Sequence, residues 1–142
     1  MMLDMVLALT VLLLLVAVVW PMLGGGTTPA LQSALALDIA TVLRTDRASA
    51  ASNGAPATTL IDLRRRAIVA ASRRRVEVPS DIAIDVTTGA ACKRAARQFA
   101  IVFAPDGSSC GGIITLSKGA MAYSIRINWF SGMIDVVGWP GT

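Results

Sequence analysis

The sequence contains no histidine, and aromatic residues account for only 5% of its 142 positions. Histidine is the usual general base near neutral pH and the commonest metal ligand in proteins. The chain also lacks a Gly-x-Ser-x-Gly segment, a phosphate-binding glycine loop and paired carboxylates in a shared segment. The loop at 108–110, Ser-Ser-Cys, has no base beside it in the sequence that could activate a nucleophile. We therefore expect that the protein is not an enzyme and has no catalytic, cofactor-binding or metal site.

Basic residues are absent before Arg44, and residues 1–23 are apolar except for Asp4, Thr10 and Pro21. At about 1.5 Å per residue, twenty helical residues span the roughly 30 Å hydrocarbon core of a bilayer. A cleavable signal peptide would need a basic start and a small-residue cleavage site, and this segment has neither. A buried core helix would need more surrounding protein than this chain supplies. We expect residues 1–23 to form a retained transmembrane helix.

Asp4 is the only charged residue in that apolar segment. On insertion scales a carboxylate at the bilayer centre costs about 2.5–3.5 kcal/mol, but near the end of a helix it can reach the interface. One interpretation is therefore a simple interfacial anchor. The other is that Asp4 pairs with a positive group, such as the N-terminal amine of a neighbouring subunit, and sets the axial register of packed helices.

A glycine-rich segment at 24–29 predicts a linker after the apolar helix. One of the two threonines before Pro29 can cap a following helix that has this proline at its first position. Apolar residues then recur at three- and four-residue spacing, which predicts an amphipathic helix over 30–53. Gly54 is suited to a left-handed C-cap, so we expect the helix to end there.

The chain from 58 to 138 predicts short strands joined by tight turns, with a strong turn signal at Pro105-Asp106-Gly107. Clean alternation over Tyr123–Trp129 predicts a strand with one buried and one solvent face. The expected fold is α+β, with residues 30–142 forming one domain in which the helix packs against an antiparallel sheet or a two-sheet sandwich. The strands are expected at 58–63, 67–70, 76–78, 82–87, 99–104, 113–116, 120–129 and 133–137.

Basic residues exceed acidic ones, giving a net charge of +4. Two arginine triplets contribute most of the excess. They are interpreted either as solvated strand ends and loops, or as a patch for an acidic partner, which would be a protein or a nucleic acid. The triplets are Arg64, Arg65 and Arg66, followed by Arg73, Arg74 and Arg75.

The chain has two cysteines, Cys92 and Cys110, 18 positions apart. Two cysteines without histidine or an acidic cluster make a poor zinc site. In an oxidising compartment they could form a disulfide whose loop closure contributes roughly 3 kcal/mol, and otherwise they would be two partly buried thiols. The sequence leaves both alternatives open.

Two segments together resemble one known family. The start, Leu-Asp-Met-Val-Leu at 3–7, resembles the Leu-Glu-Met-Leu-Val-type start of mature type IV pilins and pseudopilins, with aspartate for the usual glutamate. Pro21 lies where that family has a helix-kinking proline. The segment 103–116 resembles the Phe-x-Pro-Asp-Gly-Ser-Ser-x-Gly-Gly segment of the GspH/FimT family. The matching residues are Phe103, Pro105, Asp106, Gly107, Gly111 and Gly112.

The resemblance implies a pilin-like fold and a minor pseudopilin of the type II secretion system. Such a subunit waits in the bacterial inner membrane with its domain in the periplasm. It then joins other major and minor pseudopilins at or near the pseudopilus tip, where it supports export of folded proteins. The alternative is a minor type IV pilin that acts in pilus assembly or binds DNA for uptake. The family's basic leader, which is removed before methylation, is not among the residues before Leu3.

Overall fold

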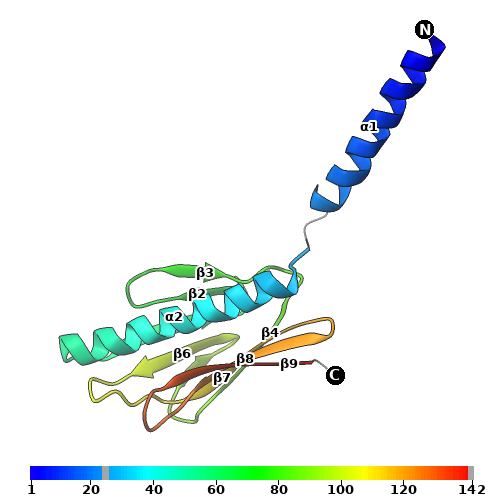
Figure 1. The fold of residues 1–142 in the computed structure, drawn as a ribbon. Helices are drawn as coiled ribbons and strands as arrows, with labels where there is room; N and C mark the ends of the chain where they lie inside the picture. The colour runs from blue at the N-terminus through cyan, green and yellow to red at the C-terminus, as the bar shows by residue number, and fades with distance from the viewer. Residues whose placement is uncertain (24–25, 141–142) are drawn as a thin grey trace.

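The computed structural model describes residues 1–23 and 26–140, and it has an α+β, pilin-like arrangement (Figure 1). An apolar helix, α1 (Met2–Leu23), stands away from a domain that begins after the linker. The side chains of residues 1–20 are all exposed. The helix is therefore long and apolar enough to cross a membrane, and the domain does not cover it.

The second helix, α2 (Pro29–Asn53), begins and ends at the predicted signals. Thr28 is the N-cap, and its hydroxyl accepts the backbone N–H of Leu31 at 3.2 Å. Gly54 is the C-cap, with a φ of 62° that glycine adopts without strain. The linker thus ends at residue 28, one residue earlier than expected, and its residues 24 and 25 lie outside the described part of the structure.

Within residues 1–23 and 26–140, nine strands form two antiparallel sheets. The five-stranded sheet has the order β3-β2-β1-β6-β5, and the four-stranded sheet has the order β4-β7-β8-β9. The two-sheet alternative is therefore the one observed. The strands are β1 (Ala57–Asp62), β2 (Ala67–Val69), β3 (Arg75–Glu77), β4 (Ala83–Thr88), β5 (Lys93–Ala95), β6 (Gln98–Phe103), β7 (Gly112–Lys118), β8 (Met121–Ile127) and β9 (Ile134–Pro140).

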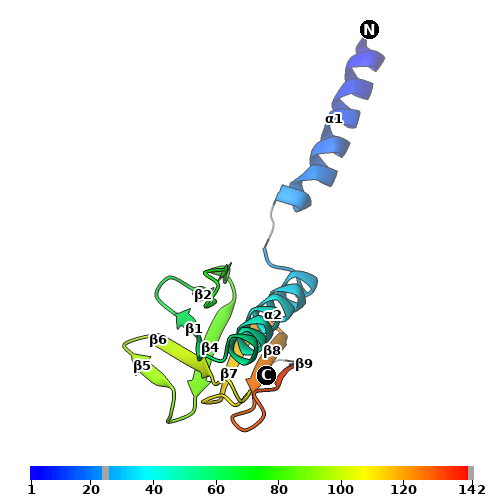
Figure 2. The ribbon, with the colours of Figure 1, turned by 90° about the vertical axis from the view of Figure 1, so that its left-hand side faces the viewer.

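Helix α2 lies against both sheets and joins their hydrophobic faces into one core (Figures 1 and 2). Ile39 and Leu43 on the helix are fully buried, as are Ile61 of β1 and Ile125 of β8. Burying one such side chain contributes about 1.5–3 kcal/mol, so the domain has a core of its own. It does not need α1 to complete that core.

Three strand predictions were wrong. Strand β9 continues to Pro140 rather than ending at Val137, because its pairing with β8 extends to Met121 opposite Pro140. Strand β5 was not expected, because its three residues are all exposed and show no apolar alternation. It exists because it pairs with β6 in the register Lys93 to Ala100. Strand β8 ends at Ile127 rather than Trp129, since the side chain of Asn128 accepts the backbone N–H groups of Phe130 and Ser131 and forms a turn.

Candidate functional site

The first candidate site is the uncovered helix α1. Asp4 lies in its first turn, fully exposed, with its carboxylate 3.9 Å from the amino group of Met1. Surface pairs of this kind contribute little by themselves, so Asp4 remains available to another partner. Pro21 lies in the last turn of α1, and its side chain is outside the described part of the structure, so the expected kink stays a prediction.

A hydrogen-bonded junction fixes the chain where it enters the domain. The carboxylate of Asp81 accepts the backbone N–H of Thr27 at 2.8 Å and its hydroxyl at 2.7 Å. Lys118 donates to the same carboxylate at 2.5 Å and to the carbonyl of Thr27 at 2.6 Å. The Lys118 ammonium and the two Thr27 donors hold the pKa of Asp81 well below its usual range. Thr27, at the start of the domain, is therefore held by Lys118 of β7 and by Asp81 in the loop before β4.

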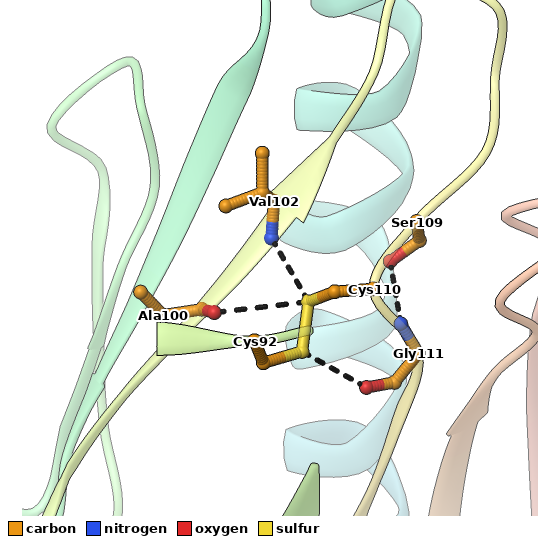
Figure 3. Close-up of a disulfide and its surroundings, with 6 residues drawn as sticks. All are labelled: Cys92, Ala100, Val102, Ser109, Cys110 and Gly111. Carbon is orange, nitrogen blue, oxygen red and sulfur yellow. Dashed lines mark hydrogen bonds between the residues drawn. A yellow bond between two sulfur atoms is a disulfide. The ribbon is translucent and has the colours of Figure 1, made fainter. Parts of the chain in front are cut away.

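A disulfide joins Cys92 to Cys110, with a Cα–Cα distance of 5.2 Å (Figure 3). Cys110 lies in the loop after β6, and its backbone N–H donates to the carbonyl of Val102 at 3.2 Å. Cys92 immediately precedes β5 and is buried. The bond therefore attaches the short edge strand β5 to the loop that carries the family-like segment.

The residues of that segment have structural roles. Phe103 is fully buried in the core. Asp106 accepts the hydroxyl and the backbone N–H of Ser108, at 2.7 and 3.0 Å, and these two donors lower the pKa of its carboxyl. Pro105 is exposed in the turn before Gly107.

The glycines of the segment sit where a side chain would collide or be strained. Gly107 and Gly111 have φ values of 90° and 78°. A Cβ on Gly111 would lie 2.9 Å from the Cβ of Trp129, and one on Gly112 would lie 3.1 Å from the carbonyl oxygen of Thr87. The segment therefore sets the path of a tight loop.

Arg47 of α2 ties this loop to the turn between β8 and β9. Its guanidinium donates to the carbonyl of Gly107 at 3.3 Å and to that of Ser131 at 2.9 Å. One turn earlier, Arg44 donates to the carbonyl of Ile134 at 2.9 Å. Local sequence does not single out these two arginines as site residues, because their partners lie 60 to 90 positions away in the chain.

The turn held by Arg47 exposes a rigid apolar surface. Trp129 and Phe130 are 68% and 75% exposed, and their rings meet edge to face at 5.6 Å between centroids. Met133, in the same turn, is 57% exposed. Aromatic side chains on a fixed backbone lose little entropy when they bind, which is typical of protein–protein contacts.

The two arginine triplets do not form one patch. They lie at opposite ends of β2. In the second triplet, Arg74 pairs with Asp38 at 2.6 Å and Arg75 pairs with Glu77 at 3.1 Å. In the first, Arg66 turns inward and donates to the carbonyl of Pro79 at 2.7 Å. The remaining three are Arg64, Arg65 and Arg73, all of them exposed.

No protein-family model, curated protein or solved structure matches this chain. The described residues offer an uncovered apolar helix, a fixed junction, a disulfide-linked set of loops and an exposed aromatic turn. The uncovered helix is suited to insertion into an apolar environment, and the exposed aromatic turn is suited to contact with another protein. The junction and the disulfide hold the neighbouring loops in place.

Proposed function

We propose that this protein is a structural minor pseudopilin of the type II secretion system. It would be anchored by α1 in the bacterial inner membrane, with its domain in the periplasm. From there it would assemble with other pseudopilins at or near the pseudopilus tip and support export of folded proteins. The observation that carries the proposal is that α1 is exposed over residues 2–20 while the domain completes its own core without them.

An apolar helix of this length must be removed from water, and two environments can do so. One is the bilayer, whose thickness it matches. The other is a bundle of similar helices, because packing against helices can replace packing against lipid tails. A subunit that waits in the membrane and then enters a fibre uses both environments in turn. Asp4 supplies the polar group that would fix the register in the bundle.

The disulfide supports a periplasmic domain, because such bonds persist in oxidising compartments and are rare in the cytosol of mesophiles. The exposed turn of Trp129 and Phe130 supports contact with another protein, since aromatic residues are enriched at interface centres. Both observations agree with a subunit that works by assembly.

The proposal is tested by purifying the full chain from its native membrane and identifying the proteins that come with it by mass spectrometry. Wild type is compared with Asp4→Ala and with Asp135→Ala, a matched control that removes an exposed carboxylate from β9. We expect other pseudopilins to accompany the wild type and the control, and to be lost or reduced with Asp4→Ala.

Three results would contradict the proposal. Recovery of pilus subunits would identify a minor type IV pilin instead. Equal recovery of pseudopilins with Asp4→Ala and wild type would remove the register role of Asp4. Absence of any pilin-like protein from all three samples would show that the resemblance to pseudopilins does not extend to function.

A further inference from the structure

Three exposed arginines gather on one edge of the domain. Arg64 and Arg65 lie in the turn between β1 and β2, and Arg97 lies in the turn between β5 and β6. The two turns are adjacent, because the backbone N–H of Leu63 donates to the carbonyl of Arg97 at 2.9 Å. We call Arg64, Arg65 and Arg97 the basic edge.

The β1–β2 turn is held through the backbone N–H groups of Arg64 and Arg65, so its hydrogen bonds do not use their guanidinium groups. The carboxylate of Asp62 accepts the N–H groups of Arg64 and Arg65 at 2.9 and 3.1 Å, and the side-chain amide of Gln98 at 3.0 Å. The side chain of Arg65 is 75% exposed and lies 4.0 Å from that carboxylate. Among residues 1–23 and 26–140, no carboxylate lies within 4.0 Å of the Arg64 guanidinium.

A short series of hydrogen bonds connects this turn to Thr27, where the chain enters the domain after α1. Arg66, the next residue in the turn, donates to the carbonyls of Pro79 and Ile82. Between those two residues, Asp81 holds Thr27 through the junction described above. Only three residues, 24–26, lie between Leu23, the last residue of α1, and Thr27, so these two residues are at most about 14 Å apart when the chain between them is fully extended.

The basic edge therefore lies on the side of the domain from which the chain continues toward α1, connected to it through Arg66, Asp81 and Thr27. Strands β2 and β3 run alongside α2 (Figure 1), and the end of β2 that follows Arg66 is the one tied to the loop containing Asp81. An arginine side chain extends several ångströms further and donates two parallel hydrogen bonds to a phosphate.

From this placement we propose that the basic edge binds the phosphate groups of anionic phospholipids in the membrane that α1 enters. The inference rests on the membrane anchoring in the proposed function and adds a ligand to it. Binding there would hold the domain against the membrane surface until the subunit leaves for the fibre, when the contact must break.

The second arginine triplet differs from the basic edge in position and in ion pairing. Arg74 and Arg75 form surface ion pairs with Asp38 and Glu77, and the triplet lies at the end of β2 remote from the basic edge. It therefore provides a control with the same residue type in the same sheet.

A nucleic acid is the less favoured ligand for the same edge. Single strands bind along grooves that combine a row of cations with aromatic side chains for base stacking. The exposed aromatics among the described residues of the domain, Trp129 and Phe130, lie in the β8–β9 turn, on the other sheet. Phospholipid headgroups, in contrast, are brought to the basic edge by α1 itself.

The test measures lipid binding to the full chain in detergent by native mass spectrometry, with phosphatidylglycerol and phosphatidylcholine as probes. Wild type is compared with Arg64→Gln/Arg65→Gln and with the matched control Arg73→Gln/Arg74→Gln, which removes the same charge. The Gln variants keep the backbone N–H groups that Asp62 accepts, and circular dichroism checks that each variant is folded.

We expect wild type to bind phosphatidylglycerol more tightly than phosphatidylcholine. At about fivefold per arginine near a membrane surface, the first double variant should lose about 25-fold in affinity for phosphatidylglycerol. The control should retain most of the wild-type affinity, and neither pair should change phosphatidylcholine binding.

Equal losses in the two double variants, or no lipid preference in wild type, would overturn the inference while leaving the anchor intact. Tight, salt-sensitive DNA binding that only Arg64→Gln/Arg65→Gln abolishes, without a lipid preference, would make the edge a nucleic-acid surface. Alkaline carbonate extraction of the wild type from its membrane tests the membrane anchoring separately from the lipid contact. Release of the chain by carbonate would contradict the proposed membrane anchoring, and with it the proposed lipid contact.

Discussion

Removing the disulfide between Cys92 and Cys110 should destabilise the domain by about 3 kcal/mol. The bond closes a loop across 18 positions, and the chain-entropy relation gives about 3 kcal/mol for a loop of this size at 25 °C. The unfolding entropy of a domain of this length is about 0.24 kcal/mol/K near 60 °C. The midpoint of thermal unfolding should therefore fall by about 13 °C.

The loss of stability should appear first at β5. This strand has three residues with exposed side chains, pairs only with β6, and is attached to the β6–β7 loop through Cys92. Without the bond, its amide hydrogens should exchange faster than those of β1, which is buried between β2 and β6.

The assay is thermal unfolding of the full chain in detergent, with hydrogen exchange measured in parallel. Cys92→Ala/Cys110→Ala is compared with wild type, oxidised and reduced, because the reduced wild type loses the bond without losing side-chain volume. Agreement between the variant and the reduced wild type assigns the effect to the cross-link. A midpoint that changes by less than about 2 °C in both would refute the reasoning from loop closure.

Two further predictions concern the junction and the loop contacts. Because Lys118 and Thr27 lower the pKa of Asp81, its stabilising effect is present above the ordinary carboxyl pKa and is lost as pH falls below about 4. Wild type should thus melt higher than Asp81→Asn at pH 7, with the difference shrinking toward pH 2; a constant difference would contradict this. Gly132→Ala should cost about 1–2 kcal/mol in left-handed strain plus about 1–3 kcal/mol from the clash with the Gly107 carbonyl. Gly119→Ala, which has a φ of 58° and open space around it, should show only the strain, and equal costs in denaturant melts would refute the clash.

The helices could be predicted from the sequence because their signals are local. An apolar run of membrane length identifies α1 by composition alone. The ends of α2 follow from a threonine before Pro29 and from Gly54, each of which acts on backbone groups within one turn. Most strands were also placed within one or two residues, since turn residues separate them.

The errors fell where contacts distant in sequence decide the structure. No local pattern in Lys93–Ala95 predicts a strand, and β5 forms only because β6 and a disulfide hold it. The alternation that ends at Trp129 favours a buried tryptophan. The Asn128 turn and the contact with Gly111 place it in solvent instead.

The apolar helix, the capped amphipathic helix and the β-rich domain follow from local sequence, because periodicity and capping act over a few residues. The ion pairing of the arginines, in contrast, depends on contacts between elements that are distant in the chain. Arg74 forms an ion pair with Asp38, 36 positions away, whereas Arg64 is exposed in the turn whose Arg66 binds the loop of Asp81. The two triplets have identical composition, and they differ in ion pairing because, among the described residues, the fold brings an acidic side chain to Arg74 and not to Arg64.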